Sequence, residues 1–100
     1  MAYEILFDPI AQQELNDLDG SVRQKVIRQI AKLRESPRLG EELGNRAGMN
    51  LTGYRKLYVD NRRVRIVYEI IEDEVRVYII AIGKREDMQV YRDTQRRIPR

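Results

Sequence analysis

Two stretches between residues 10 and 33 carry apolar side chains at every third or fourth position. That spacing places the apolar side chains of each stretch on one face of a helix. Asp8 and Pro9 precede the first stretch, and these residue types are typical of the cap and the first position of a helix. Ser21 can cap the second stretch, and Pro37 ends it because the residue before a proline avoids the helical conformation. We therefore predict a short strand at residues 3–7, followed by an antiparallel hairpin of two helices.

From Tyr54 onward, the period of the apolar residues changes from helical spacing to two. Residues 54–59, 63–71 and 75–82 are rich in β-branched and aromatic side chains, which is typical of strands. The turns between them are so short that the strands must pair antiparallel. We predict a three-stranded meander in which the helices cover the face of Val64, while Arg65 lies on the opposite, partly open face.

The remaining segments complete the predicted fold. Residues 38–53 carry four glycines and show little periodicity, so we predict a connecting loop anchored by Leu43 and by a later apolar residue. The strand 75–82 breaks at Gly83, and we expect a C-terminal helix to follow it. The whole pattern predicts an α+β fold in a single domain of residues 1–100.

Composition narrows the chemistry that this domain can perform. The chain contains neither cysteine nor histidine, so disulfides, the usual zinc sites and histidine-based acid–base catalysis are excluded. Any general base must be a carboxylate, a lysine or a tyrosine, and we expect no metal and no cofactor. No apolar run approaches a membrane span, and the N-terminus lacks a signal-peptide pattern, so we expect a cytoplasmic protein.

Positive charge is concentrated in the second half of the chain. Residues 1–50 carry seven Lys and Arg against eight Asp and Glu, for a net charge of −1, whereas residues 51–100 carry twelve against eight, for a net charge of +4. This asymmetry suits a polyanion such as nucleic acid, although a similar excess also occurs on ordinary solvated surfaces.

Arg65, Arg85 and Tyr91 are the candidates for catalysis. Two guanidinium groups at neighbouring strands can bind one phosphate and stabilise its developing charge. A phenol close to such cations has a lowered pKa and can act as a base. The set is coherent with RNA cleavage in which a phenolate takes the proton from a 2′-hydroxyl. From spacing alone, however, packing is the more common role for a tyrosine such as Tyr91.

Several short motifs match those of one known family. They are Gly53-Tyr54-Arg55, Val64-Arg65-Ile66-Val67-Tyr68, the run from Val77 to Arg85, and Val90-Tyr91. With the order of predicted elements, these motifs resemble the RelE branch of the RelE/ParE toxin superfamily over nearly the whole chain. The resemblance implies the RelE-like microbial RNase fold. It also implies an endoribonuclease that cuts mRNA in the ribosomal A site without a metal and is held inactive by an antitoxin.

The resemblance also assigns roles to individual residues. Arg65 matches the arginine that contacts the scissile phosphate, Arg85 matches the arginine that stabilises the transition state, and Tyr91 matches the tyrosine proposed as general base. The family has two further basic residues on the first meander strand. Arg55 fits the earlier one, but Leu57 stands at the later position. The resemblance therefore leaves the proton donor open.

Two further expectations concern the surroundings of this site. Lys56 is the cation nearest to Leu57, and we expect it to bind RNA together with Arg55, Arg63 and Lys84. The interval from Tyr54 to Arg65 is one residue longer than in the family, so a bulge or a longer turn is expected near residues 60–63.

The resemblance implies partners as well. They are a cognate RelB-like antitoxin with an acidic segment, the ribosome with its mRNA and rRNA, and operator DNA bound through the antitoxin; no membrane is implied. Two alternatives stay open, namely a ParE-like inhibitor of DNA gyrase and an inactive toxin homologue that acts as co-repressor with its antitoxin. The joint presence of Arg65, Arg85 and Tyr91 favours the nuclease.

Overall fold

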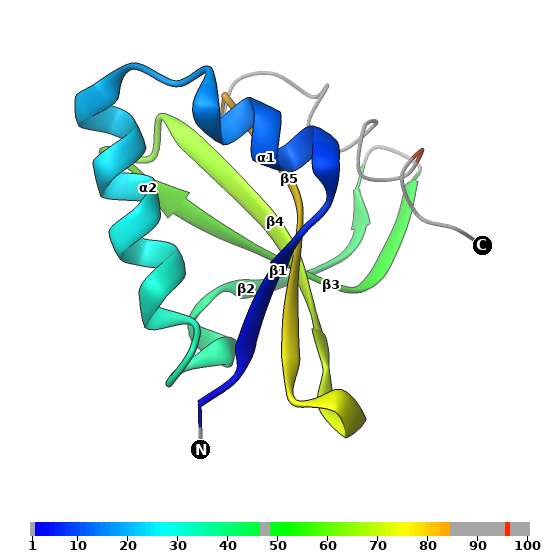
Figure 1. The fold of residues 1–100 in the computed structure, drawn as a ribbon. Coiled ribbons are helices and arrows are strands. Elements are labelled where there is room, and N and C mark those ends of the chain that lie inside the picture. The colour runs from blue at the N-terminus through cyan, green and yellow to red at the C-terminus, as the bar shows by residue number, and fades with distance from the viewer. Residues whose placement is uncertain (1, 47–48, 85–95, 97–100) are drawn as a thin grey trace.

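Two helices pack against one face of a five-stranded sheet (Figure 1). The computed structural model describes residues 2–46, 49–84 and 96. The elements in chain order are β1 (Glu4–Phe7), α1 (Pro9–Asn16), α2 (Gly20–Lys32), the 3-10 helix η1 (Pro37–Leu39), β2 (Glu41–Arg46), β3 (Met49–Val59), β4 (Val64–Ile71), the 3-10 helix η2 (Glu72–Glu74) and β5 (Arg76–Lys84). The α+β fold class that the sequence predicts is therefore confirmed.

The strands lie in the order β1-β5-β4-β3-β2. β1 pairs parallel to β5, and the other neighbours pair antiparallel, so the predicted meander β3-β4-β5 forms the centre of the sheet. The loop predicted at residues 38–53 is wrong, because β2 and the first half of β3 form a hairpin there. Glycines in this hairpin obscured the strand pattern in the sequence. Gly44 and Gly53 adopt φ angles of 62° and 95° near a register shift, a backbone conformation that glycine adopts without strain.

The helices begin with aspartate caps. The Asp8 carboxylate accepts a hydrogen bond from the backbone N–H of Ile10, as predicted, and Pro9 occupies the first turn of α1. The cap predicted at Ser21 is wrong, because α2 begins at Gly20 and the Asp19 carboxylate caps it by accepting from the backbone N–H of Ser21. None of the described helices is both long and apolar enough to cross a membrane.

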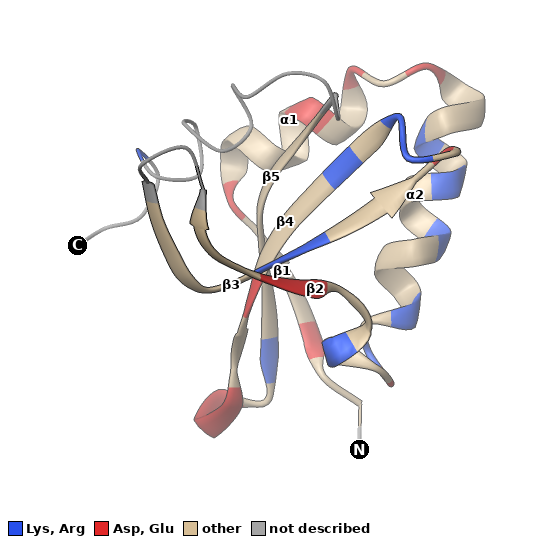
Figure 2. Cartoon of the chain, turned by 180° about the vertical axis from the view of Figure 1, so that it is seen from behind, with Lys and Arg blue, Asp and Glu red and all other residues tan. Residues whose placement is uncertain are grey.

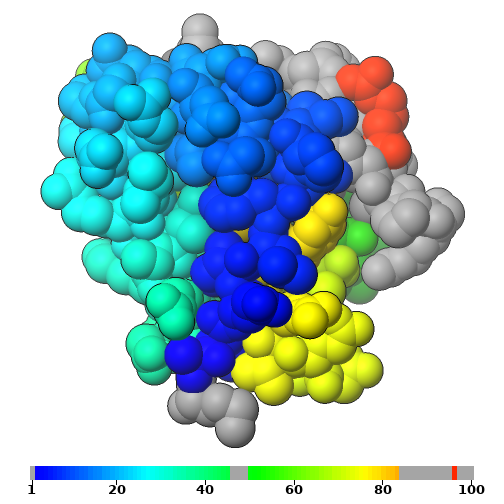
Figure 3. All heavy atoms as spheres, viewed as in Figure 1, coloured from blue at the N-terminus to red at the C-terminus, as the bar shows by residue number. Residues whose placement is uncertain are grey.

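α1 lies mainly on β5, whereas α2 contacts both α1 and β3. α1 packs on β5, and Figure 1 shows the two helices running in different directions. The predicted antiparallel hairpin of helices is therefore wrong in detail. Figure 3 shows that the helices and β1 cover this face of the molecule.

The core beneath the helices contains the side chains that the period-two pattern predicts. Its buried residues are Ala11, Leu15, Val26, Ile30, Leu33, Val59, Val64, Ile66, Tyr68, Val77, Ile79 and Ile82. The middle strand thus presents Val64, Ile66 and Tyr68 to the helices, as expected from their alternation.

A second, smaller core lies on the opposite face of the sheet. A bulge in β5 makes this possible, because Val67 pairs with Ala81 and Tyr68 pairs with Ile79, which leaves Ile80 as the extra residue. The buried members of this core are Leu43, Leu51, Tyr54, Val67, Ile80 and Ala81. The prediction of a partly open face around Arg65 is therefore wrong. The unpredicted hairpin brings apolar side chains over this face, and Arg65 is only 7% exposed.

β5 continues two residues beyond its predicted end. Gly83 pairs with Arg65, and Lys84 pairs with Val64, so the break expected at Gly83 does not occur. Glu14 of α1 accepts a hydrogen bond of 3.0 Å from the backbone N–H of Ile82, beyond the point where β1 stops pairing with β5. The helix expected after Gly83, which would carry Arg85 and Tyr91, lies outside the described residues.

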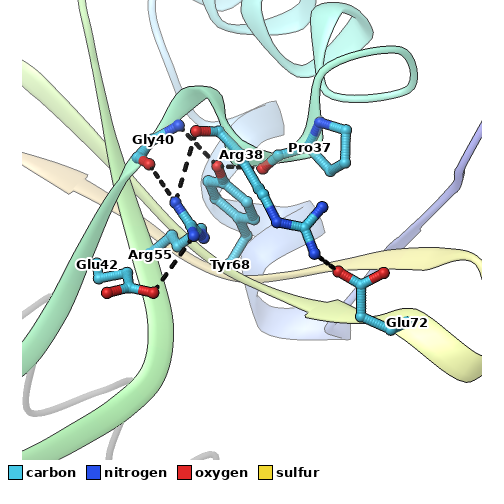
Figure 4. A network of polar contacts seen from close by, with 7 residues as sticks. All are labelled: Pro37, Arg38, Gly40, Glu42, Arg55, Tyr68 and Glu72. Atoms are coloured by element: carbon cyan, nitrogen blue, oxygen red, sulfur yellow. Dashed lines mark hydrogen bonds and ion pairs between the residues drawn. The ribbon is translucent and has the colours of Figure 1, made fainter.

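A network of polar contacts fixes the segment between α2 and β2 (Figure 4). The buried Tyr68 hydroxyl donates to the carbonyl of Pro37 at 2.7 Å and accepts from the N–H of Gly40 at 2.9 Å. A Cβ atom at Gly40 would come within 2.4 Å of the Lys56 carbonyl oxygen, so only glycine allows this close approach. Burial raises the pKa of Tyr68, which keeps this phenol neutral. Tyr68 is therefore a structural residue.

Replacing Tyr68 with phenylalanine should lower the free energy of unfolding by about 1 to 3 kcal/mol, because the carbonyl of Pro37 and the N–H of Gly40 lose their partner inside the protein. Urea denaturation would measure this. Tyr3→Phe is the matched control, because the hydroxyl of Tyr3 bonds the exposed Glu72 and its loss leaves no buried group unpaired. Equal stability of the Tyr68 and Tyr3 variants would contradict the structural role of Tyr68.

Candidate functional site

Lys56, Tyr58 and Arg65 come together on the sheet face that the helices leave uncovered. Tyr58 of β3 lies directly opposite Arg65 of β4, and Lys56 lies opposite Val67, so the three side chains project to the same side. Gly83 of β5 is the partner of Arg65 on the other side and has no side chain. Viewed from behind, the turn between β3 and β4 and the adjoining part of β4 carry basic residues, and a separate basic stretch lies further back along β3 (Figure 2).

Three cations surround the ring of Tyr58. The Lys56 Nζ atom donates to the Tyr58 hydroxyl at 3.1 Å and lies 5.0 Å from the ring centroid. The guanidinium carbon of Arg65 lies 5.4 Å from the same centroid, and that of Arg62 lies 4.5 Å from it. The electron-rich face of the ring attracts each of these positive charges.

The Tyr58 phenol is acidic for a tyrosine. Burial raises its pKa, but the hydrogen bond from Lys56 and the charges of Arg65 and Lys56 outweigh that effect and lower the pKa from 10.0 to about 8. Perturbed groups of this kind gather at functional sites. The sheet face therefore combines a phenol of lowered pKa with a buried guanidinium group.

Tyr58 borders open space, whereas its two basic neighbours on the strands are buried. Lys56 and Arg65 are each 7% exposed. Tyr58 is half-buried and lines a hollow of about 400 Å³ at the end of β3. The other lining residues are Lys25, Gln29, Val59, Asp60, Asn61 and Arg62. Tyr58 is thus the member of the cluster that borders this hollow.

The turn between β3 and β4 contributes Arg62. Asp60, Asn61 and Arg62 have φ angles of 55°, 54° and 67°, so three consecutive residues adopt the left-handed conformation. Lys25 of α2 holds the turn through an ion pair of 2.8 Å with Asp60. The β3–β4 pairing before this turn has no bulge, and the greater length of the turn relative to the family stays a prediction.

Arg55 is not part of the cluster. It pairs with Tyr68 and therefore lies on the helix-covered face, where its guanidinium group donates to the carbonyl of Gly40 at 2.7 Å and approaches Glu42 at 3.4 Å (Figure 4). Leu57 packs against the core on the same face. The structure thus separates Arg55 from Arg65 by the sheet, and the role of Arg55 in RNA binding stays a prediction.

The structure describes some of the other predicted site residues and leaves two outside the described part of the chain. Lys56 does join Arg65, as the preceding distances show. Arg63 is exposed in the turn before β4, one residue before the strand begins. Lys84 ends β5, and its backbone pairs with Val64. Arg85 and Tyr91 lie outside the described residues, so their positions relative to Arg65 stay predictions.

Tyr58 is the site residue that the sequence analysis missed. The sequence did contain a signal, because Lys56 and Tyr58 are two residues apart on one strand and therefore share a face. A meander turn of this length brings that face beside Arg65. The resemblance directed attention to Arg55 and Leu57 instead, which the pairing places on the other face. Among the described residues, no group of three acidic side chains could hold a metal ion.

Comparisons with known proteins agree with this fold. The family model described as the ParE toxin of the type II toxin-antitoxin system parDE matches residues 5–89. The mRNA interferase toxin RelE of Escherichia coli (strain K12) is 34% identical over 98% of this chain and 99% of its own length. A putative RelE-like toxin protein of Escherichia coli is 27% identical over 91% of this chain and 92% of its length.

Solved structures give the same result. A free E. coli toxin RelE carrying two arginine-to-alanine substitutions superposes with a TM-score of 0.78 at 33% identity, covering 98% of this chain and 99% of that one. The toxin of the intact E. coli RelBE toxin-antitoxin complex gives a TM-score of 0.68 at 31% identity and covers 83% and 96% of the two chains. The chain therefore belongs to the RelE/ParE superfamily of type II toxins, as a RelE-type member.

Proposed function

We propose that this protein is the toxin of a type II toxin-antitoxin system and acts as a ribosome-dependent mRNA endoribonuclease. The observation that carries the proposal is the 34% identity to the E. coli mRNA interferase toxin RelE over nearly the full length of both chains. The cluster of Lys56, Tyr58 and Arg65 supplies a physical basis, because it combines phosphate-binding charge with a group able to transfer a proton.

The reaction is an attack within the RNA strand. The 2′-oxygen of one ribose attacks the adjacent phosphorus, the bond from phosphorus to the 5′-oxygen breaks, and the products are a 2′,3′-cyclic phosphate and a 5′-hydroxyl end. One proton leaves the 2′-hydroxyl and one reaches the 5′-oxygen, so the step consumes no water and needs no metal. Opening of the cyclic phosphate would be a later step.

Arg65 binds the scissile phosphate in this proposal. Its guanidinium group stabilises the charge that grows on the phosphoryl oxygens, and its burial beside β3 and β5 holds it in one place. Arg85 adds a second positive charge, and the Tyr91 phenolate takes the proton from the 2′-hydroxyl. The ribosome orders the mRNA for this attack.

The proposed partners follow from the charge of the site. Structures of RelBE complexes contain a RelB antitoxin bound to a RelE-type toxin. We expect a RelB-like antitoxin here, with an acidic segment that covers Lys56 and Arg65 and blocks RNA. The toxin-antitoxin complex would bind operator DNA through the antitoxin.

Expression without an antitoxin should arrest translation and leave cuts within translated mRNA. The measurement is mapping of 5′ ends on cellular mRNA, together with cleavage by purified protein of an mRNA on programmed ribosomes and of the same RNA free in solution. Free RNA should be cut far more slowly, since ordering of the reactants is lost.

The gyrase-inhibitor alternative predicts the opposite pattern. The match to a ParE family model is consistent with this alternative. Intact mRNA with DNA damage after expression would favour it and reject the nuclease. Equally fast cleavage of free RNA would reject the dependence on the ribosome.

A further inference from the structure

We propose that Tyr58 is the general acid of the cleavage reaction and donates its hydroxyl proton to the departing 5′-oxygen. The inference rests on the proposed nuclease function and deepens it by naming the proton donor. Leu57, which stands at the position of a basic residue in the family, cannot perform this role because its side chain is apolar and packs against the core.

Tyr58 lies at the right place for a group that acts on a phosphate held by Arg65. The two residues are direct partners in the β3–β4 pairing and share one face, so their side chains are neighbours. Gly83, on the far side of Arg65, adds no side chain over this part of the sheet. Tyr58 is half-buried, so part of its side chain remains open to solvent.

The hydrogen bonds orient the Tyr58 proton. The ammonium group of Lys56 can only donate, so the Tyr58 oxygen accepts in their contact of 3.1 Å. The proton of the Tyr58 hydroxyl must therefore point away from Lys56. Lys56 itself is buried, and its ammonium lies between the Tyr58 oxygen and Glu41, which is 3.9 Å away. Lys56 is thus a positioning residue, because its ammonium is held against the Tyr58 oxygen.

The proton balance assigns one phenol to each end of the reaction. Tyr91, as base, receives the proton of the 2′-hydroxyl while the bond from the 2′-oxygen to phosphorus forms. Tyr58, as acid, gives its proton to the 5′-oxygen while the bond from phosphorus to that oxygen breaks. Tyr58 is left as a phenolate, and Lys56, Arg62 and Arg65 surround it with positive charge. Exchange with solvent restores both groups.

The same charges suit Tyr58 to an acid role at neutral pH. Facing it are Lys56 on its own strand, Arg65 on β4, Arg62 and Asp60 in the turn, and Lys25 on α2. With a pKa of about 8, roughly nine-tenths of Tyr58 is protonated at pH 7, yet it is a stronger acid than an ordinary tyrosine. Deprotonation at higher pH removes the donor, so Tyr58 should produce a fall in rate on the alkaline side.

A change of leaving atom tests this role directly. A synthetic mRNA is placed on programmed ribosomes with either the normal 5′-oxygen or a sulfur atom at the scissile linkage. Sulfur leaves as a thiolate and needs no proton, because thiols are far more acidic than alcohols. Tyr58→Phe should slow single-turnover cleavage of the oxygen linkage by about 10²- to 10⁴-fold, and should cleave the sulfur linkage within about tenfold of the parent rate.

Matched variants separate catalysis from folding. Tyr78→Phe removes a phenol oxygen from the same sheet face at the far end of β5, and should match the parent on both linkages. Lys56→Met keeps the bulk of the side chain but removes the charge beside Tyr58. It should slow the oxygen linkage more than the sulfur linkage, with a smaller difference between the two than Tyr58→Phe shows, and it serves as the second test if Tyr58→Phe does not fold.

Results other than these would overturn the proposal. If Tyr58→Phe cleaves the oxygen linkage at the parent rate, or is equally slow on both linkages, Tyr58 is not the acid, although the nuclease function stands. If Lys56→Met is equally slow on both linkages, the link between Lys56 and proton donation is wrong. If the parent protein cuts neither linkage, the proposed nuclease function itself fails and the role of Tyr58 fails with it.

Discussion

Replacing Arg65 with alanine should slow single-turnover cleavage on the ribosome by at least about a hundredfold, while the protein remains folded. One preorganised donor aimed at developing charge is typically worth about 3 to 4 kcal/mol, which is a few hundredfold in rate. Arg65 is such a donor, because the sheet pairing with Tyr58 and Gly83 fixes its position and it is almost fully buried.

The shape of the arginine side chain matters as much as its charge. Arg65→Lys keeps the positive charge but loses the planar fork that binds two phosphate oxygens, so it should recover only part of the lost rate. Arg28→Ala is the matched control, because Arg28 is an exposed basic residue on α2 and its loss removes the same charge from a distant surface. Cleavage rates and thermal unfolding should be measured for all three variants.

The outcome decides between two roles of Arg65. If Arg65→Ala reduces cleavage no more than Arg28→Ala does, Arg65 serves the packing of the sheet and the phosphate is held elsewhere. If Arg65→Lys cleaves as fast as the parent, charge alone is enough, and the argument from guanidinium geometry is wrong. If Arg65→Ala unfolds below the assay temperature, Arg65→Lys replaces it in the comparison with Arg28→Ala.

Local patterns allowed the central part of the fold to be predicted. The alternation at Val64, Ile66 and Tyr68 predicted the buried face of β4, and Asp8 with Pro9 predicted the start of α1. These signals depend on neighbouring residues only, so they survive in a single sequence.

Features that depend on distant pairing could not be predicted in this way. The hairpin of β2 and β3 contains glycines that suppress the strand pattern, although its backbone pairs regularly on either side of a register shift. That hairpin supplies Leu43 and Leu51 to the second core. The second core therefore depends on residues far away in the sequence, and the alternation of β4 alone carried no sign of it.

Only part of the candidate site could be predicted, because the rest depends on pairing between distant residues. Arg65 and Lys56 were identified from residue type and resemblance, and the pairing brings them together. Tyr58 was missed because its chemistry arises from three cations that only the paired strands and their turn assemble. A tyrosine on a strand has no unusual pKa until those neighbours are in place.

Replacing Tyr91 with phenylalanine should slow cleavage by about 10²- to 10⁴-fold, which is the usual worth of a positioned base. The change removes one oxygen, so folding and ribosome binding should change little. Unlike Tyr58→Phe, the Tyr91 variant should be equally slow on oxygen and sulfur linkages, because a better leaving atom does not help to deprotonate the 2′-hydroxyl.

This contrast between the two tyrosines assigns acid and base within one experiment. Tyr78→Phe again controls for the loss of a phenol oxygen on the sheet. If Tyr91→Phe cleaves at the parent rate, Tyr91 is a packing aromatic, and Lys56 or a ribosomal group is the next candidate for the base. If the sulfur linkage restores Tyr91→Phe instead, Tyr91 protonates the leaving oxygen and Tyr58 must take the proton of the 2′-hydroxyl. Its pKa of about 8 would then produce a rate that rises with pH up to that value.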